Sequence, residues 1–416
     1  MVSLKDKRIL LIFLTVFIDL VGFGIIIPMN PYLAKEFGAT PVQVGWLMSI
    51  YSLMQFVFAP FWGKLSDRWG RRPIILLSLF ASAASHFGFA FAESYWGLFV
   101  FRMLAGVGGG NLPVAMAYIA DITDEKNRSK GMGLIGAAFG LGFILGPALG
   151  GIFSGVGLKL GSAPPFGESF PGIVASAICF VNLLGAIFYL PESLSAEVRK
   201  DQKNRKVKFE TPWTRLKNIF LKSQQSASLA RLYGVYFLTG LSLAVVEIPL
   251  FLFVEAKFGW TMAQASYGFA YIGVLMVLTQ GYFIRKWLPR LGERKMLPLG
   301  LILFGVGLGG CAFASSPWGM APFVTFLAIG YGLSNPTLTG SISLLSSAEE
   351  QGSNLGVAQS LASLARILGP ISGGYLFEQW FMGAPFLTGG LLALTGFLVS
   401  LAVLKKLRSG EKEATP

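Results

Sequence analysis

The stretch Phe61-Trp-Gly-Lys-Leu-Ser-Asp-Arg-Trp-Gly-Arg-Arg72, followed by Pro73, decides the fold of this chain. It separates two long apolar runs and contains four cations: Lys64, Arg68, Arg71 and Arg72. Short connections rich in lysine and arginine stay on the cytoplasmic side of a bacterial-type membrane. The stretch therefore predicts a cytoplasmic hairpin between two membrane-spanning helices, and it sets the orientation of the spans on either side.

The composition is that of an integral membrane protein. Of the 416 residues, 53% are hydrophobic and only 13% are charged, which leaves too little polar surface to cover a soluble globule of this length. A hydrocarbon core of about 30 Å requires about 20 apolar residues per helix. The runs that meet this requirement are 8–29, 44–63, 73–92, 95–120, 130–153, 170–190, 229–254, 263–286, 296–315, 318–343, 354–377 and 383–404. The sequence thus predicts an all-α membrane protein with twelve transmembrane helices.

The net charge of +13 reflects topology. Of the 34 lysines and arginines, 29 lie near the termini or in connections of one parity, as the positive-inside bias requires when both termini are cytoplasmic. We therefore expect a multi-pass protein of the cell (inner) membrane and no nucleic-acid partner. The two cysteines, Cys179 and Cys311, lie in apolar spans without metal-ligand spacing, so we expect no cofactor and no metal site.

The chain divides into two halves that repeat each other. Residues 1–190 and 229–416 each hold six spans, and a basic, polar linker at 191–228 joins them. Two repeated patterns are Phe37-Gly38 with Thr40 and Gln43, which recurs as Phe258-Gly259 with Thr261 and Gln264, and Leu145–Gly151, which recurs as Leu368–Gly374. A parallel duplication of six-helix halves is the architecture of one class of secondary transporter, whose substrate lies near mid-membrane between the halves.

Three motifs resemble those of the major facilitator superfamily. The hairpin Gly63-Lys-Leu-Ser-Asp67-Arg68-Trp-Gly70-Arg71-Arg72 is similar to the family signature between its second and third helices. Arg102 with Gly106 and Gly108 resembles the fourth-helix motif, and Gly142 with Gly146-Pro147 and Gly150-Gly151 resembles the fifth-helix motif of its proton antiporters. The stretches 51–56, 66–73 and 117–123 look most similar to the tetracycline efflux branch. The resemblance implies the major facilitator fold and a drug:proton antiporter.

Asp19 is a lone acid in the first span, about 16 Å into the bilayer at 1.5 Å per residue. An ionised carboxylate there costs about 2.5 to 3.5 kcal/mol. Burial favours the neutral form of an acid and a nearby cation favours the charged form, so the protonation of Asp19 can follow its access to water. Arg102 lies at a depth that differs by roughly 5 Å. The family's fourth-helix arginine is thought to take part in proton coupling, and the resemblance gives Asp19 and Arg102 that role; a permanent structural ion pair is the alternative.

The hairpin also resembles a conformational latch that stabilises the outward-open state in the family. Asp67 suits the N-terminal dipole of a facing helix, here the start of the eleventh span near Ser353 and Asn354. Arg71 or Arg72 suits a bidentate pair with Asp121. A purely topological role for the cations leaves a carboxylate and two glycines at fixed spacing without explanation. The latch residues are Gly63, Asp67, Arg68, Gly70, Arg71, Arg72 and Asp121.

The fifth span carries a helix-kink motif made of Gly142, Gly146, Pro147 and Gly150. Glycines permit close helix contact, and proline removes a backbone donor and bends a helix. We expect a kinked, tightly packed span that blocks leakage when the cavity closes. The glycines expected in close helix contact also include Gly136 and Gly140.

Several polar side chains in the spans would face a central cavity, where a few hydrogen bonds on an apolar wall recognise a ligand. Some of them would instead form interhelical pairs worth about 0.6 kcal/mol each. The candidates for substrate binding are Gln55, Asn111, Gln280, Asn335, Gln359, Arg366, Tyr271 and Tyr331, with Tyr51 as a further aromatic neighbour.

Three ionisable residues in the spans have open roles. Arg366 lies about 18 Å deep, where the tetracycline branch usually carries a small polar residue, so it needs either an anionic group of the substrate or a structural partner. Glu247, about 24 Å from the inner edge, is expected at the outer rim more than in a cation-binding site. His86, the single histidine, is expected to pack peripherally; the lack of a carboxylate here weakens the case for tetracycline as the substrate.

The sequence predicts a proton-coupled exporter of amphipathic small molecules that alternates access by rocking two pseudo-symmetric six-helix halves. Its expected partners are a small-molecule substrate, protons and membrane lipid, and we expect a monomer. The alternatives are a carrier of organic anions or lipids built around Arg366 and a non-transporting membrane sensor. An enzyme is not expected, because one lone histidine with no cysteine or metal cluster gives no catalytic pair.

Overall fold

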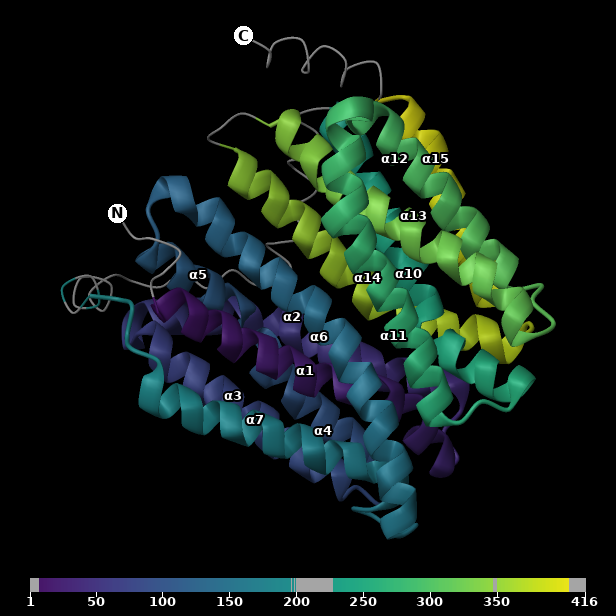
Figure 1. Cartoon of the computed structure of the whole chain (residues 1–416), viewed down its shortest axis with the longest axis horizontal. Helices are drawn as coiled ribbons and strands as arrows, with labels where there is room; N and C mark the ends of the chain where they lie inside the picture. The colour runs from purple at the N-terminus through teal and green to yellow at the C-terminus, as the bar shows by residue number, and fades with distance from the viewer. Residues whose placement is uncertain (1–6, 196, 198, 200–226, 347–349, 404–416) are drawn as a thin grey trace. The chain divides into compact units, whose positions relative to one another are not determined.

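The computed structural model describes residues 7–195, 197, 199, 227–346 and 350–403, and this part of the chain is helical with short connections and no strand. Most of the predicted linker at 191–228 lies outside the described residues. The helices of the first half are α1 (Lys7–Glu36), α2 (Pro41–Trp69), α3 (Arg71–Ala90), α4 (Tyr95–Gly108), the 3-10 turn η1 (Gly109–Asn111), α5 (Leu112–Ile122), α6 (Glu125–Leu160), the 3-10 turn η2 (Gly167–Ser169) and α7 (Phe170–Tyr189). Figure 1 shows them from purple to teal.

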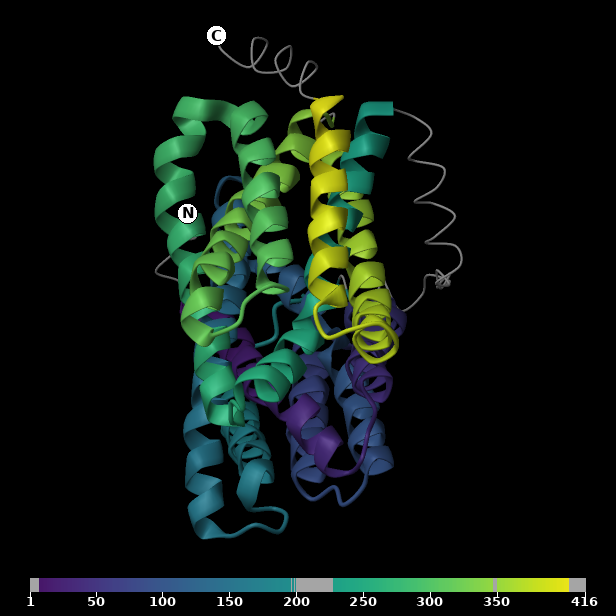
Figure 2. The same cartoon turned by 90° about the vertical axis from the view of Figure 1, so that its right-hand side faces the viewer.

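The second half begins with α10 (Ala227–Phe258). It continues through α11 (Met262–Leu278), the π-helical turn η3 (Thr279–Phe283), α12 (Ile284–Cys311), α13 (Pro317–Leu344), α14 (Gln351–Gln379) and α15 (Ala384–Leu401). Gly292 divides α12, because its φ of 66° and ψ of 168° are not helical. Figure 2 shows the green chain reversing direction there.

The described residues contain the twelve predicted spans. Nine stretches are long and apolar enough to cross a membrane, and one of them, Met262–Cys311, is the 50-residue stretch that Gly292 divides into two. The more polar α13 and α14 are 28 and 29 residues long, so each is also long enough to cross. The prediction of an all-α membrane protein with twelve spans is confirmed.

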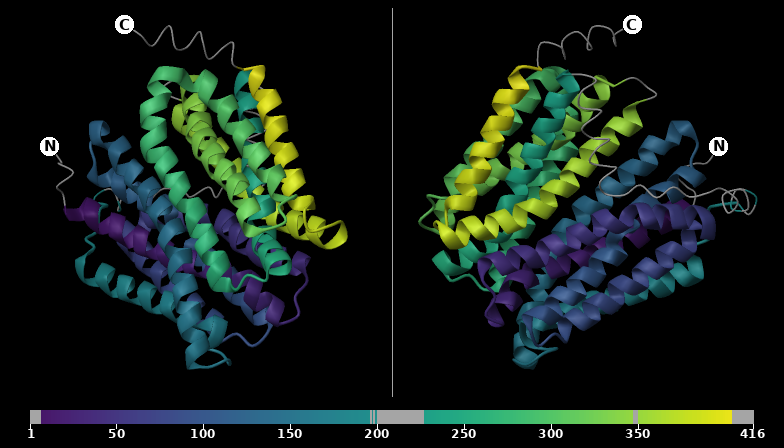
Figure 3. Two further views of the ribbon diagram at one scale, coloured as in Figure 1. Left: turned by 45° about the vertical axis from the view of Figure 1, so that its right-hand side comes forward. Right: turned by 180° about the vertical axis from the view of Figure 1, so that it is seen from behind.

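Two compact units form. Unit 1 comprises Met1–Ala39, Ile50–Thr211 and Thr261–Ala270, and unit 2 comprises Thr40–Ser49, Pro212–Trp260 and Tyr271–Pro416. In unit 1, α1 packs against α6 and α7, and α3 packs against α4 and α7. In unit 2, α10 packs against α14 and α15, and α12 packs against α13 and α15. Each unit therefore has the same order of helix contacts, which can be followed in the two views of Figure 3.

The predicted repeat extends to the turns that start and stop the helices. Gly38 and Gly259 end α1 and α10 with φ angles of 73° and 65°, which a residue without a Cβ adopts at low cost. The amide of Thr40 then donates to the side chain of Gln43 at 2.8 Å, and the amide of Thr261 donates to the side chain of Gln264 at 2.9 Å. These are capping boxes, and both copies start the next helix in the same way.

Glycines bring α1 against α6 and α10 against α14. A Cβ built on Gly146 would lie 2.5 Å from the Cα of Gly24, and a Cβ on Gly373 would lie 2.0 Å from the carbonyl oxygen of Val245. Side chains at these positions would force the helices apart, as expected where small residues form a helix interface. The same expectation for Gly136 is wrong, because nothing lies within 4 Å of a Cβ built there.

Candidate functional site

A small cavity lies around Asp19 in unit 1. Its volume of about 10 Å³ is close to the space of a single water, and Asp19, Phe23, Tyr51, Ser82, His86 and Ala105 line it. The side chains of Ser82 and Asn111 hydrogen-bond the Asp19 carboxyl group. Its Oδ1 atom is nevertheless buried with no hydrogen-bond partner among the described residues. A buried acceptor therefore lies beside a space for one water.

Arg102 lies beside the same cavity. Its side chain comes from α4 and is 1% exposed. The guanidinium carbon is 4.7 Å from the ring centroid of Tyr51 and 5.6 Å from that of Phe23, within cation–π range of both rings. Because these two rings line the cavity of Asp19, the structure brings the predicted acid and cation to one place.

His86 also belongs to this cavity. It is 4% exposed, lies four residues after Ser82 on the same face of α3, and interacts electrostatically with Arg102. His86 is therefore buried, as a packing histidine would be, and it also lines the cavity of Asp19. The periodicity of α3 offers the signal that the sequence analysis did not use, since Ser78, Ser82, Ser85 and His86 are all buried in an otherwise apolar helix.

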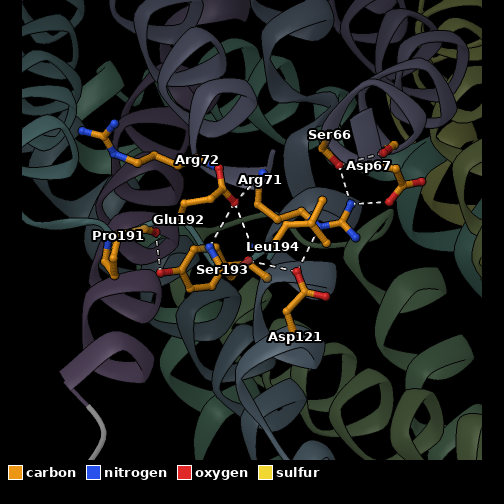
Figure 4. A network of polar contacts seen from close by, with 11 residues as sticks. Ser66, Asp67, Arg71, Arg72, Asp121, Pro191, Glu192, Ser193 and Leu194 are labelled. Carbon is orange, nitrogen blue, oxygen red and sulfur yellow. Dashed lines mark hydrogen bonds and ion pairs between the residues drawn. The ribbon is translucent and has the colours of Figure 1, made fainter. Parts of the chain in front are cut away.

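The cytoplasmic hairpin predicted from residues 61–72 forms a polar network centred on Arg71, shown in Figure 4. Arg71 is 8% exposed; its Nη1 donates to Asp67 at 2.5 Å and to Ser66 at 2.7 Å, and its Nε donates to Asp121 at 3.1 Å. One guanidinium thus joins the ends of α2, α3 and α5. The pairing is shared between Asp67 and Asp121 and is not the bidentate contact with Asp121 that the sequence suggested.

The other hairpin residues have separate environments. Arg72 is the more exposed arginine, and its Nη2 donates to the carbonyl of Ile187 at 2.6 Å. Gly70 adopts a φ of 105°, which only glycine adopts easily. The hydroxyl of Ser66 donates to the carbonyl of Gly63 at 2.6 Å, and Arg68 lies in the last turn of α2. The side chain of Ser353 lies outside the described residues, and the amide of Asn354 donates to Ser346 at 2.9 Å.

The sequence analysis missed Glu192. Its carboxylate accepts the backbone N–H groups of Arg71 at 2.9 Å and Arg72 at 3.2 Å, so it caps the N-terminus of α3. The same group accepts the amides of Ser193 and Leu194 at 3.0 and 3.1 Å. A Cβ at Gly70 would lie 2.2 Å from this carboxylate. Glycine at this position is therefore favoured by its φ angle, and a side chain there would also displace the Glu192 carboxylate from its hydrogen bonds.

The two polar candidates in unit 1 contact neighbouring helices. The amide of Gln55 donates to the carbonyl of Gly109 at 2.8 Å, and the amide of Asn111 donates to Ser78 at 2.5 Å. Because Asn111 also bonds the Asp19 carboxyl group, it positions that acid. Gln55 and Asn111 thus each hydrogen-bond a residue of a neighbouring helical segment.

Arg366 gathers a second group of polar residues in unit 2. Its guanidinium donates to Ser363 at 3.2 Å and interacts electrostatically with Tyr236 and Tyr331, and Tyr331 also interacts with Glu247. The side chains of Gln280, Gln359 and Arg366 are exposed. The remaining candidates are Asn335, which is half-buried on α13, and Tyr271, which is 45% exposed and hydrogen-bonds Thr325 at 2.9 Å.

Twelve membrane helices in two similar units, with a half-buried acid and a buried arginine beside one cavity, are typical of a class of membrane transporter. The family model of the Major Facilitator Superfamily matches residues 12–290 and 232–416. The chain belongs to this superfamily. It is a transmembrane transporter and not an enzyme.

Similar proteins align with nearly the whole chain. It is 33% identical to the class E tetracycline resistance protein of Escherichia coli over 90% of both chains. It is 30% identical to multidrug resistance protein 2 of Bacillus subtilis over 97% of this chain and 96% of the relative. Among solved structures, the human organic anion transporter MFSD10 (TETRAN) is 26% identical, with a TM-score of 0.70 over 95% of this chain and 99% of that chain. The resemblance to the tetracycline branch of drug transporters is confirmed.

Proposed function

We propose that this protein exports amphipathic small molecules in exchange for protons, with Asp19 as the proton carrier. The observation that carries the proposal is the buried Asp19 Oδ1, which has no hydrogen-bond partner among the described residues and lies at a water-sized cavity. An isolated charge in such surroundings is costly, so gain of a proton changes the free energy of the site. The tetracycline and multidrug resistance relatives support export as the direction.

The transport step follows from the charges around the cavity. With Asp19 ionised, the attraction of the nearby Arg102 guanidinium stabilises the carboxylate. A proton that arrives from the outer side neutralises the acid and weakens this attraction, which frees Arg102 to shift its contacts. Substrate that enters from the cytoplasm favours the state in which Asp19 releases its proton to the inside. Coupling then arises because substrate and proton stabilise different states of the same site.

We propose that the six-helix halves 1–190 and 229–416 rock to alternate access. The network of Arg71, Asp67 and Asp121 serves as the cytoplasmic latch, and the start of α14 is its proposed partner. The positive-inside bias supports cytoplasmic termini in the cell (inner) membrane. The protein works as a monomer in this scheme, with membrane lipid around it.

Transport by reconstituted vesicles tests Asp19. With tetracycline and, separately, ethidium as probes, an imposed pH gradient should drive uphill transport by the wild-type protein. Asp19→Asn should lose this uphill transport and keep exchange of labelled for unlabelled substrate, since exchange needs no net proton movement. Asp19→Glu, which retains a carboxyl group, is the matched control. Uphill transport by Asp19→Asn with the wild-type dependence on the pH gradient would show that Asp19 is not the carrier.

A second candidate function is carriage of organic anions through Arg366. The exposed Arg366 guanidinium near Tyr236 and Tyr331 offers a positive charge beside aromatic groups, and the solved relative MFSD10 is an organic anion transporter. Thermal stabilisation by aromatic carboxylates, lost in Arg366→Gln, would favour this function. Stabilisation by aromatic ammonium ions alone would count against it.

A further inference from the structure

A second ionisable residue, His86, lines the cavity of Asp19. Asp19 comes from α1 and His86 from α3, and both line the same space of about 10 Å³. His86 is the only histidine in the chain, and it is 4% exposed. A water needs at least two polar partners to be held in a protein interior. The Asp19 Oδ1 acceptor, the Ser82 hydroxyl and the His86 imidazole supply them here.

The other ionisable groups around the cavity come from three helices. Arg102 from α4 interacts electrostatically with His86, and Cys179 from α7 interacts with Asp19. Tyr51 from α2 lines the cavity with its ring under the Arg102 guanidinium. The set therefore holds one permanent cation, one carboxyl group, one imidazole, one thiol and one phenol.

We propose that a water in this cavity joins Asp19 to His86, and that His86 passes the transported proton to or from Asp19. The proposal rests on the proton coupling proposed above and adds a second residue to it. In the transfer, the carboxyl O–H bond breaks as an imidazole N–H bond forms through the water, so a carboxylate and an imidazolium replace two neutral groups. The imidazolium then gives a proton to water of the aqueous side that is open, which restores the neutral imidazole. Proton uptake by Asp19 runs through the same steps in reverse.

Arg102 determines how long His86 holds the proton. A guanidinium near the imidazole opposes a second positive charge, as Coulomb's law requires. His86 is therefore a place through which the proton passes, whereas the neutral or ionised state of Asp19 persists between steps. A histidine that served only for packing could occupy the same position, but it would not affect the pH dependence of transport.

Ring-¹⁵N-histidine NMR of the full chain in lipid nanodiscs tests the link directly, because the single histidine gives one set of signals. The protein is purified with a tag that contains no histidine. At pH values between about 5 and 9, the chemical shifts of both ring nitrogens of His86 should differ between Asp19→Asn and the wild type. Glu247→Gln, which removes a carboxyl group of unit 2, should leave them unchanged. Identical His86 signals in the wild type and Asp19→Asn would overturn the link.

Transport by His86 variants tests the relay. His86→Gln and His86→Asn should lower pH-driven transport of tetracycline by about tenfold or more and change its pH profile, since proton transfer by a positioned group contributes at least this much. Exchange of labelled for unlabelled tetracycline should stay within about twofold of wild type, which also shows that the variants fold. A wild-type pH profile in both variants would overturn the relay and leave Asp19 as sole carrier. Failure of the wild type itself to couple transport to the pH gradient would instead contradict the proposed function, and the NMR result would still decide the link.

Discussion

Arg71 is the centre of the polar network formed by the hairpin of unit 1. Its guanidinium contacts Ser66, Asp67 and Asp121 from a position that is 8% exposed. Only arginine presents several donors in a fixed plane, so one side chain bonds groups from two helices at once. Arg72 has the same charge but is only half-buried and donates to a single carbonyl, that of Ile187. The neighbouring arginines therefore separate the effect of geometry from that of charge.

Arg71→Lys should lower the melting temperature and transport, because a lysine keeps the charge but loses at least one charge-assisted hydrogen bond, worth about 1.5 to 3 kcal/mol. Arg72→Lys is the matched control and should retain transport within about twofold. Thermal unfolding in detergent and vesicle transport measure the two effects. Equal behaviour of the two variants would mean that only charge matters in the hairpin.

Glu192→Gln tests the cap of α3. The amide oxygen still accepts hydrogen bonds but carries no charge at the helix N-terminus, so the loss should be about 0.5 to 2 kcal/mol in unfolding free energy. Glu197→Gln, an exposed acid five residues further on, should change stability much less. Denaturation monitored by tryptophan fluorescence compares the pair. A Glu192→Gln protein as stable as Glu197→Gln would contradict the cap.

At the scale of the element, α6 has one face that packs closely against α1, called here the close face, and another face that does not. Gly146 lies against Gly24 of α1, whereas Gly136 of the same helix faces open space. Gly142 and Gly150 share the close face, with Leu20 and Ile25 as neighbours. The helix also continues through Pro147, whose Cδ lies near Gly24. The glycine spacing therefore serves contact with one particular helix, α1.

Gly146→Ala should destabilise the protein by about 1 to 3 kcal/mol, because the added methyl group overlaps the backbone of Gly24. Gly136→Ala should be neutral or stabilise by about 0.5 to 1 kcal/mol, since alanine favours a helix more than glycine does. Melting temperatures of the two variants in one detergent give the comparison. A Gly146→Ala protein as stable as Gly136→Ala would show that α1 and α6 separate without cost.

At the scale of the whole molecule, two copies of one scaffold carry different charges. Gly146 and Gly369 occupy corresponding places on α6 and α14, and both contact the first helix of their half. The cluster of Asp19, His86 and Arg102 occurs in unit 1, whereas Arg366 and Glu247 lie in unit 2. Backbone contacts have been retained in both copies while the ionisable groups have diverged.

Single cysteines should report the predicted membrane topology. In a background with Cys179→Ser and Cys311→Ser, which removes two buried thiols, Glu93→Cys and Ser315→Cys should react with an impermeant maleimide in intact cells. Trp69→Cys and Leu291→Cys should react only after permeabilisation, because both hairpins are rich in cations. Reaction of Trp69→Cys in intact cells would place that hairpin outside and reverse the proposed orientation.

Much of this structure could be predicted from the sequence. The lengths of the apolar runs predicted the spans, and the repeated glycines and capping residues predicted the duplication. These patterns can be recognised in sequence because each depends on residues that are close together in the chain. Asp19 and Arg102 stood out since a charge in a span is costly. The contacts of Glu192 could not be predicted, because they join residues about 120 apart in sequence. The buried polar face of α3 can be found from its periodicity, but the contact of His86 with the cavity of Asp19 could not be predicted, because it depends on which helices pack against that face.

The position of Glu192 gives the chain that follows it a mechanical connection to the hairpin. The segment Pro191–Leu194 is anchored by Tyr118, which donates to the carbonyl of Pro191, and by Ser193, which donates to Asp121. Tension applied to the polypeptide beyond Leu194 would therefore pull on two supports of the Arg71 guanidinium, the amide end of α3 and the Asp121 carboxylate. A change in the chain after Leu194 that pulled on this segment would therefore disturb the hairpin network without contacting the cavity of Asp19.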